Sequence, residues 1–520
     1  MPSNETYVSQ ILEVISAEPE KVVLSWRDRT LTAAELTTLV RSAAQALHRH
    51  SNGTDDGADG TDGTVVAILT VTNTGPTLVL RYAANLVGAT VVHLHTTNAV
   101  DPADHLAADA KLKILRETGA TYLAVDAETV ATARELRERL DTPLALVALG
   151  DLGPDVLDLT AGDPDALDAD AVGIGLDRTA VVTYTSGTTG EPKGIAFDFR
   201  ARNGFISAGL QMGWRSVYLA CLPLSHSSGA TADDSLASGG SVVLRDGFDP
   251  GDALRCVERY GITRMLLSPP QLYLLMDHPE VGSTDLAGLR MVTYVGSPAS
   301  PERLGEAVKV FGDVLIQVYA TSEAGFVSML SPAEHLDARL RVTVGRPMPG
   351  WVRITDPDDH RDLPPGETGE VCVRSPFTMS EYVAEPELTA RTVQDGWVHT
   401  GDLGSVDGDG YLHLRGRIGE VIKTNGIKIH PVTVENALLA HPAVVQAAVF
   451  CVRDQDRIEH LHAAVVLREP GTADPGGLAE HIRATISPKH VPARIHIRST
   501  LPLTGVGKPD KARLAVEASG

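Results

Sequence analysis

The sequence predicts an α/β fold: a large N-terminal domain of layered α/β subdomains plus a small β-barrel, followed by a small α+β C-terminal domain. Short apolar runs rich in β-branched residues alternate with longer helical patterns as far as about residue 340, which is typical of α/β layers. Between about 340 and 416, strand-like segments separated by turns such as PPGETG and DGDG predict the hairpins of the barrel. A change of charge near residue 418 indicates where the C-terminal domain begins.

Individual elements are predicted from their own patterns. Buried strands are expected at residues 64–71, 90–95, 180–185, 241–245 and 291–296, where β-branched and apolar residues gather. Helical patterns occupy residues 77–89, 253–261 and 300–312. Ser300 precedes the last of these and is its expected N-cap, because a serine hydroxyl can accept a hydrogen bond from the first turn.

Charge is unevenly distributed along the chain. The 520 residues include 45 Lys or Arg and 67 Asp or Glu, which gives a net charge of −22. Residues 418–520 alone contain 12 Lys or Arg and 10 Asp or Glu, so this part has a slight positive charge. This shift predicts one domain of residues 1–417 and another of residues 418–520. The negative field of the whole chain repels phosphate backbones, which argues against nucleic acid as a partner.

Other features bound the location and the class of protein. No apolar run reaches the roughly 18 residues of a membrane span, and the first residues lack a basic segment followed by an apolar core. Four scattered cysteines show no metal-ligand spacing. We therefore expect a cytoplasmic protein with reduced thiols and no membrane partner. The Asp- and Gly-rich residues 52–63 do not fit a calcium-loop spacing and are predicted to be a solvated linker.

The most informative segment is TYTSGTTGEPKGIAF at residues 183–197. Glycines allow backbone N–H groups to approach an anion, hydroxyl groups add donors, and a lysine adds positive charge, so this composition favours a polyphosphate. The spacing is not that of the P-loop, and the segment taken alone also fits a flexible surface turn. The candidate ligands of the phosphate are Thr185, Ser186, Gly187, Thr188, Thr189, Gly190 and Lys193.

Four further segments, together with this one, resemble the motifs of the adenylate-forming superfamily in their order and spacing. They are VYATSEAG at 318–325, HTGDLG at 399–404, GRIGEVIKTNGIKIHPVTVEN at 416–436 and LPLTGVGKPDKARL at 501–514. The superfamily includes acyl-CoA synthetases, aryl-acid ligases, peptide-synthetase adenylation domains and firefly luciferase. The resemblance implies a ligase that activates a carboxylic acid with ATP and Mg²⁺, and it implies that the C-terminal domain is mobile.

The resemblance also implies the nucleotide contacts. Tyr319 would stack on adenine, Asp402 would accept the ribose hydroxyls, and Arg417 would contact the ribose or a phosphate. Each has a structural alternative: a core aromatic for Tyr319, a turn aspartate for Asp402 and an ion pair for Arg417. The other implied nucleotide-binding residues are Gly296, Ser297, Pro298, Ala320, Thr321 and Ser322.

Catalytic roles are implied for three residues. Lys508 would stabilise the charge that develops when a carboxylate attacks the α-phosphate. Glu323, with Thr185, would hold Mg²⁺, although an acidic residue at a helix N-terminus is the alternative. His226, in LPLSHSSGA at 222–230, would gate the acid pocket or orient the carboxylate, unless it is a hydrogen-bonded core histidine. The implied pocket residues are His226, Gly229, Tyr294 and Gly325.

Three positions depart from the superfamily's pattern: Ala320 replaces a glycine, Ser322 replaces a threonine, and Gly419 stands at the hinge where Asp or Lys is usual. The implied reaction has two half-reactions. After the acyl-adenylate forms, the C-terminal domain rotates about Gly419, and coenzyme A, or an amine, attacks the mixed anhydride. The alternatives are a diazotase that activates nitrite and acts on an arylamine, and a catalytically silent nucleotide-binding regulator.

Overall fold

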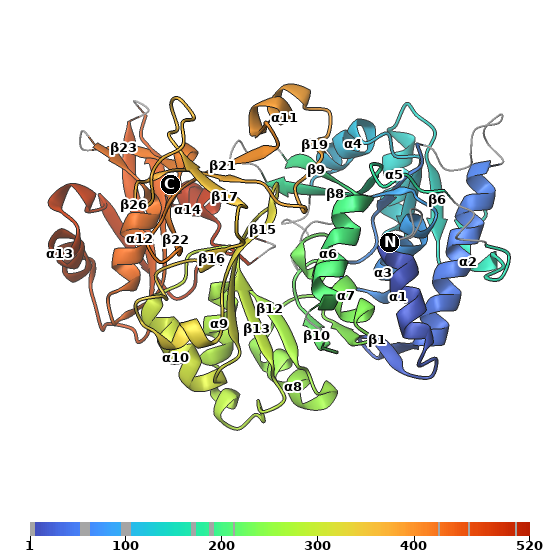
Figure 1. Cartoon of the computed structure of the whole chain (residues 1–520), viewed down its shortest axis with the longest axis horizontal. Helices are drawn as coiled ribbons and strands as arrows, with labels where there is room; N and C mark the ends of the chain where they lie inside the picture. Colours follow the sequence, from blue (N-terminus) through green and yellow to red (C-terminus); the bar gives the residue numbers. More distant parts are fainter. Residues whose placement is uncertain are drawn as a thin grey trace. The chain divides into compact units, whose positions relative to one another are not determined.

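The chain folds into two compact units in the computed structural model, which describes residues 6–52, 63–94, 106–167, 173–186, 192–211, 214–424, 427–455, 458–504 and 507–519. Unit 1 comprises Met1–Leu266 and Pro376–Arg391, and unit 2 comprises Leu267–Ser375 and Thr392–Gly520 (Figure 1). The predicted domain boundary after residue 417 falls inside unit 2 and stays a prediction. Most of the predicted linker at 52–63 lies outside the described residues.

One sheet of unit 1 has the strand order β19-β9-β8-β4-β3-β5-β6-β7. The run from β8 to β7 is parallel, and β9 and β19 add antiparallel strands at one edge. Its strands are nearly continuous apolar runs, as expected where helices cover both faces of a parallel sheet. The bounds are β3 (Val65–Ile68), β4 (Thr90–His93), β5 (Tyr122–Val125), β6 (Ala145–Ala148), β7 (Val156–Asp158), β8 (Thr179–Ser186), β9 (Pro192–Asp198) and β19 (Glu381–Tyr382).

Other strands of unit 1 pair in the order β12-β10-β11-β1-β2, with only the β1–β2 pair antiparallel. Their bounds are β1 (Val22–Trp26), β2 (Arg29–Thr32), β10 (Val217–Ala220), β11 (Ser241–Leu244) and β12 (Arg264–Leu267). The helices are α1 (Tyr7–Ser16), α2 (Ala33–Asn52), α3 (Gly75–Leu86), α4 (Ala108–Glu117), α5 (Val130–Glu138), α6 (Phe199–Gln211), α7 (Ser227–Ala237), α8 (Pro250–Tyr260) and α11 (Pro386–Thr392). The chain passes to unit 2 at the end of α11.

Asn73 joins the loop before α3 to the ends of two strands of the second sheet. It is fully buried and has a φ of +55°, a conformation that asparagine tolerates better than most residues. Its side-chain amide donates to the backbone oxygens of Leu222 (2.9 Å) and Arg245 (2.8 Å), and its side-chain oxygen accepts from the backbone N–H of Leu224 (3.0 Å). One side chain thus fixes the segment that follows β10.

In unit 2, β13 and β14 are parallel, and β15 and β16 extend them as antiparallel strands. A second, wholly antiparallel sheet has the order β17-β18-β21-β20, with β22 also paired to β21, and forms the half-barrel. The bounds are β13 (Met291–Val295), β14 (Leu315–Thr321), β15 (Gly325–Leu330), β16 (Arg346–Pro347), β17 (Val352–Thr355), β18 (Gly369–Val373), β20 (Val393–Gln394), β21 (Trp397–Val406) and β22 (Leu412–Arg417).

The C-terminal part of unit 2 is an α+β arrangement around the sheet β25-β26-β27. Residues alternate between two apolar clusters along β26: Leu461, Ala463 and Val465 face the cluster that includes α12 and α13, and Ala464 and Val466 face the one that includes α14. The bounds in this part are β23 (Ile422–Thr424), β24 (Ile427–Ile429), β25 (Val444–Arg453), β26 (Glu459–Leu467), β27 (Arg494–Arg498), α12 (Pro431–Leu439), α13 (Pro475–Thr485) and α14 (Lys511–Ser519). Two helices lie earlier in unit 2: α9 (Pro269–Met276) and α10 (Pro301–Phe311).

The predicted fold class and the predicted elements are confirmed, with shifts at their ends. The expected strands at 180–185, 241–245 and 291–296 are β8, β11 and β13, and Ser300 caps α10 by accepting from the backbone N–H of Arg303. Helix α8 begins at Pro250 rather than at residue 253, because Asp249 caps it and a proline suits the first turn. Among the described residues, no helix combines the length and the apolar composition that crossing a lipid bilayer requires.

Replacing Asn73 with alanine is predicted to destabilise unit 1 by about 2–4 kcal/mol. The change removes the side-chain partner of two buried backbone groups and of one part-buried group. It also puts alanine, which tolerates a positive φ less well than asparagine, at a φ of +55°. Calorimetric melting of the purified protein measures the loss. Asn436→Ala, at an exposed position of α12, is the control and should change the melting midpoint little; an equal shift in both variants would contradict the role of Asn73.

Candidate active site

The predicted site residues fall into two groups, one in each compact unit. Unit 1 holds the ends of the predicted phosphate loop and the segment around His226. Unit 2 holds Tyr319, Glu323, Asp402, Arg417 and Lys508.

The predicted phosphate loop connects the antiparallel strands β8 and β9. Thr185 is opposite Lys193 and Ser186 is opposite Pro192. Gly187, Thr188, Thr189 and Gly190 lie outside the described residues. Thr185 and Lys193 are both half-buried. Because β8 is parallel to β4, Thr185 lies at a carboxyl edge of the sheet, where ligands commonly bind in open α/β folds.

The segment that contains His226 is tied to β8. The hydroxyl of Thr183 donates to the backbone oxygen of Ser225 (3.1 Å). His226 is half-buried and is the N-cap residue of α7, but its side chain does not make the capping hydrogen bond. A Cβ at Gly229 would overlap the carbonyl oxygen of Leu224, so this position requires glycine for packing. His226 is only half-buried, and both its pocket role and its alternative as a hydrogen-bonded core histidine stay predictions.

Asp402 lies at the centre of the group in unit 2. It is 7% exposed and is on β21, directly opposite Arg417 on β22. Its Oδ1 accepts from Arg417 Nε (2.8 Å) and its Oδ2 accepts from the hydroxyl of Tyr319 (2.6 Å). Burial raises the pKa of Asp402, and Arg417 and the Tyr319 hydroxyl oppose this rise by stabilising the carboxylate.

Tyr319 is part of the half-barrel core and also reaches Asp402. It is 8% exposed and belongs to an apolar cluster with Val371, Val398 and Leu412. Burial, and then the charge of Asp402, raise the pKa of Tyr319 well above its usual range, so its hydroxyl remains a donor. The predicted structural alternatives for Tyr319 and Arg417, a core aromatic and an ion pair, are therefore both present in the fold.

Glu323 lies in the tight hairpin turn between β14 and β15, rather than at a helix N-terminus. Thr321 closes this turn with its hydroxyl, which accepts from the backbone N–H of Ala324 (3.0 Å), and Gly325 has a φ of +66°. Ser322 is exposed and Glu323 is half-buried. A register irregularity between Tyr319 and Ala320 turns the end of β14.

Lys508 approaches this group from a turn near the C-terminus. Its backbone N–H donates to the Thr504 hydroxyl (3.2 Å), and its carbonyl accepts from the Thr504 backbone N–H (2.7 Å). A Cβ at Gly296, which has a φ of +99°, would lie 2.9 Å from Lys508 Cε and 3.8 Å from Nζ. The glycine therefore leaves the room that the lysine side chain uses.

The charges of unit 2 act on Lys508 together. Removal of water by the surrounding protein, and then the positive charge of Arg417, lower the pKa of Lys508; Asp402, Glu420 and Glu323 act in the opposite direction. The residue nevertheless has an exposed surface. Lys508 is thus a cation that the fold brings within electrostatic range of the predicted ribose, phosphate and magnesium residues.

Ser297, in the segment predicted to line the nucleotide, carries an orphaned polar atom. Its Oγ is buried and has no hydrogen-bond partner among the described residues, which suits a position that a ligand completes. Pro298 is exposed.

Tyr294 and Gly419 are not drawn into this group. Tyr294 is 1% exposed, and its hydroxyl bonds to Gln317 Oε1 (3.1 Å) and His335 Nε2 (2.9 Å). Gly419 is in the short 3₁₀ helix Ile418–Glu420, and a Cβ there would meet no described residue within 4 Å. The pocket role of Tyr294 and the hinge role of Gly419 stay predictions.

Sequence reasoning missed Glu420 and Glu370. Glu420 acts on Lys508 and lies 3.7 Å from Lys511 Nζ, and its place beside the predicted hinge was an available signal. Glu370 Oε1 accepts from the backbone N–H of Gly401 (3.0 Å), next to Asp402. Nothing in the sequence indicates this contact, because it depends on the register of β18 against β21.

Chemically, the group in unit 2 can hold a ligand that has hydroxyl donors and a negative charge. The Asp402 carboxylate can accept hydroxyl hydrogen bonds in addition to those it receives, since two oxygens offer about four acceptor positions. Arg417 and Lys508 supply positive charge, and Glu323 supplies carboxylate oxygen.

Comparison with known proteins gives two family matches. Residues 12–383 match the model of the AMP-binding enzyme family, and residues 433–508 match that of the AMP-binding enzyme C-terminal domain. The predicted boundary at residue 417 lies between the two matched regions.

Individual relatives are similar over nearly the whole chain. The medium/long-chain-fatty-acid–CoA ligase FadD8 of Mycobacterium tuberculosis is 32% identical over 96% of this chain and 88% of its own length. The structure of the amide bond synthetase McbA from Marinactinospora thermotolerans has a TM-score of 0.85 and 34% identity, covering 99% of both chains. The o-succinylbenzoate CoA synthetase MenE from Bacillus subtilis, in complex with its acyl-adenylate intermediate, has a TM-score of 0.76 and 26% identity, covering 98% of both chains.

Replacing Arg417 with glutamine is predicted to raise the pKa of Lys508. The substitution removes the positive charge that lowers this pKa and frees Asp402 to attract the ammonium group more strongly. The lysine side chains are labelled with an acylating reagent at a series of pH values, and the extent of labelling at Lys508 is measured by peptide mass spectrometry. The midpoint of Lys508 labelling against pH should lie at higher pH in the variant. Arg415→Gln, at an exposed position of the same strand, is the control; a midpoint that does not move, or that moves equally in the control, would refute the coupling.

Proposed function

We propose that this chain activates a carboxylic acid as an acyl-adenylate and transfers the acyl group to coenzyme A. The chain belongs to the AMP-binding enzyme family and is an AMP-forming ligase. In the first half-reaction the acid attacks the α-phosphate of ATP and pyrophosphate leaves. In the second, the thiol attacks the mixed anhydride and AMP leaves.

The observation that supports this proposal is that the Lys508 side chain lies beside Gly296 and within electrostatic range of Arg417, Asp402 and Glu323 in unit 2. Negative charge builds on the transferring phosphoryl group and on pyrophosphate as the carboxylate attacks. A cation that is already in place, and partly stripped of water, stabilises that charge without reorganisation, which is worth about 3–4 kcal/mol for one well-placed donor.

Each group of residues is proposed to contribute to nucleotide binding. Asp402 would accept the ribose hydroxyls, and Tyr319, with Gly296–Pro298, would border the adenine. The orphaned Oγ of Ser297 supports this assignment, because a bound nucleotide would give it a partner. The hydroxyl groups, glycines and Lys193 of the β8–β9 hairpin would hold the phosphates.

Magnesium is proposed to be held by Glu323 and Thr185 together with the phosphates, and it would neutralise charge on the triphosphate. A half-buried carboxylate and a hydroxyl are ligands of the kind that Mg²⁺ takes while keeping several waters. His226, half-buried at the start of α7, would contact the carboxylate of the acid or close its pocket.

Between the two half-reactions, the domain of residues 418–520 is proposed to rotate about Ile418–Gly419 and withdraw Lys508. Gly419 has no side chain, and glycine can absorb the large change in backbone angles that such a rotation needs. AMP is a good leaving group, and the second half-reaction therefore needs mainly the positioning of the nucleophile.

Coenzyme A is the proposed acceptor because the relatives include the fatty-acid–CoA ligase and the o-succinylbenzoate CoA synthetase described above. An amine is the second candidate, since the amide bond synthetase is 34% identical over 99% of both chains. Activation of nitrite for diazotisation of an arylamine is retained as a third outcome of the acceptor experiment below.

The cytoplasm is the proposed location. Cys221, Cys256, Cys372 and Cys451 are all free thiols in the fold, and three of the four are buried. Unpaired cysteines suit a reducing compartment.

An assay with different acids and acceptors is predicted to give pyrophosphate with one class of carboxylic acid and a thioester when coenzyme A is added. Medium- and long-chain fatty acids, aryl acids and nitrite are each incubated with MgATP, alone and with coenzyme A, an alkylamine or an aminophenol acid. If an amide forms and no thioester forms, the acceptor is an amine rather than coenzyme A. A diazo chromophore would favour the nitrite reaction. Nucleotide binding without pyrophosphate release from any acid would indicate a silent regulator.

Lys508→Ala is predicted to lower acyl-adenylate formation about 10²–10³-fold and to leave thioester formation from supplied acyl-adenylate nearly unchanged. The lysine is needed only for charge on the transferring phosphoryl group, which is absent from the second half-reaction. Pyrophosphate release and thioester yield are measured separately. Lys309→Ala, at an exposed position of α10, is the control. Equal loss of both half-reactions in Lys508→Ala would contradict the proposed division of roles.

A further inference from the structure

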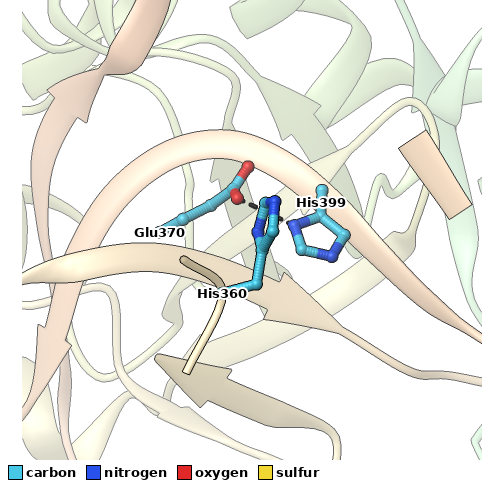
Figure 2. Close-up of side chains that lie close together, drawn as sticks. All are labelled: His360, Glu370 and His399. Carbon is cyan, nitrogen blue, oxygen red and sulfur yellow. Dashed lines mark hydrogen bonds and ion pairs between the residues drawn. The ribbon is translucent and has the colours of Figure 1, made fainter. Parts of the chain in front are cut away.

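Three side chains with metal-binding atoms meet on the half-barrel sheet, next to the segment that leads to Asp402. They are His360, from the connection between β17 and β18, Glu370 on β18 and His399 on β21. Figure 2 shows the two imidazole rings and the carboxylate converging on one point from these three segments. One ligand atom from each residue lies within 4.8 Å of those of the other two.

Glu370 and His399 form a buried and well-positioned pair. Their side chains are 8% and 7% exposed, and His399 Nδ1 is 2.8 Å from Glu370 Oε2. The other carboxylate oxygen, Oε1, accepts from the backbone N–H of Gly401 (3.0 Å), which fixes the carboxylate plane. Two of the three ligand positions are therefore held in place by the fold before any ion arrives.

The connection between β17 and β18 brings the third ligand to this pair. The backbone of His360 is left-handed, with a φ of +59°, and its N–H donates to the carbonyl of Asp356 (2.9 Å). Its ring lies edge-on to that of His399, with 4.8 Å between centroids. His360 is exposed, so the site opens to solvent on the side of this residue.

The neighbouring thiol does not join the set. Cys372 Sγ is 3.5 Å from His399 Nδ1 and 3.3 Å from the Thr355 hydroxyl. The group of described residues whose ligand atoms all lie within 4.8 Å of one another does not include this thiol. The ligands are two imidazole nitrogens and one carboxylate oxygen.

We propose that His360, Glu370 and His399 bind a divalent transition-metal ion such as Zn²⁺, in addition to the Mg²⁺ of the proposed nucleotide site. Two histidines and one glutamate are a ligand set that Zn²⁺ uses in proteins, with water in the open position, and imidazole favours Zn²⁺ over Mg²⁺. The ion replaces the hydrogen bond that His399 Nδ1 donates to Glu370 Oε2, and the ring of His399 then carries its proton on Nε2. Through His360 and His399, the ion links the connection between β17 and β18 to strand β21.

The contrasting reading is that the His399–Glu370 pair only orients the segment that leads to Asp402. In that reading His360 is an exposed residue of a connecting segment with no role. The two readings differ in what the loss of His360 does: it removes metal binding in the first and changes nothing in the second.

The experiment titrates metal-free protein with Zn²⁺ by calorimetry, in the presence of excess Mg²⁺ and in the absence of nucleotide and acid. The wild-type chain is expected to bind one Zn²⁺, and His360→Asn is expected to bind it at least about tenfold more weakly. Asparagine tolerates the left-handed backbone, so the variant keeps the fold of the connection. Cobalt(II) added to the same proteins should give a visible absorption band that the variant lacks.

His413→Ala is the matched control. His413 is on the same sheet and pairs with a carboxylate, with Nε2 2.8 Å from Asp407 Oδ2, and it is not part of the three-residue cluster. It should bind Zn²⁺ as the wild type does. Zn²⁺ binding that is equal in the wild type and His360→Asn, or a loss that is the same in both variants, would overturn the proposal. Neither result depends on ligase activity, so it leaves the proposed function untouched.

Discussion

The pairing of Asp402 with Arg417 across β21 and β22 is the interaction on which the arrangement of unit 2 depends. It is placed by strand register, and the hydroxyl of Tyr319 completes it from β14. A buried carboxylate is costly unless it is paired and hydrogen-bonded. Asp402 has both a cation and a hydroxyl donor, and so it can remain in a position where a ligand can also use it.

The same pair connects the half-barrel to the C-terminal residues. Arg417 is the last residue of β22 and immediately precedes the 3₁₀ helix Ile418–Glu420. Glu420 lies near both Lys508 and Lys511, and Lys511 also bonds Glu435 (2.9 Å). A chain of alternating charges therefore runs from Asp402 to the turn that carries Lys508, and a change at one end alters the electrostatic potential at the other.

Much of this fold could be predicted from the sequence, because its elements have local signals. The strand β8 is a β-branched run, and α10 has its serine cap, so both follow from short-range rules. The family resemblance also follows from short segments and is confirmed by the match over residues 12–383. The contact between Tyr319 and Asp402 is different: 83 residues separate them, and the chain passes through unit 1 in between. The meeting of His360 with His399 likewise needs both a strand register and a left-handed backbone that no local pattern indicates.

The balance of charge around Lys508 also bears on its proposed role in only one of the two half-reactions. In the free chain, the surrounding protein and Arg417 disfavour its ammonium form, and three carboxylates favour it. On the proposed function, a bound triphosphate adds several negative charges and strengthens the attraction, so Lys508 is held most firmly when the acid attacks. When pyrophosphate leaves, most of that attraction is lost while the repulsion from Arg417 remains. On the proposed function, the electrostatic state that follows adenylate formation favours withdrawal of Lys508, and the glycine at position 419 suits the change in backbone angles that this movement would need.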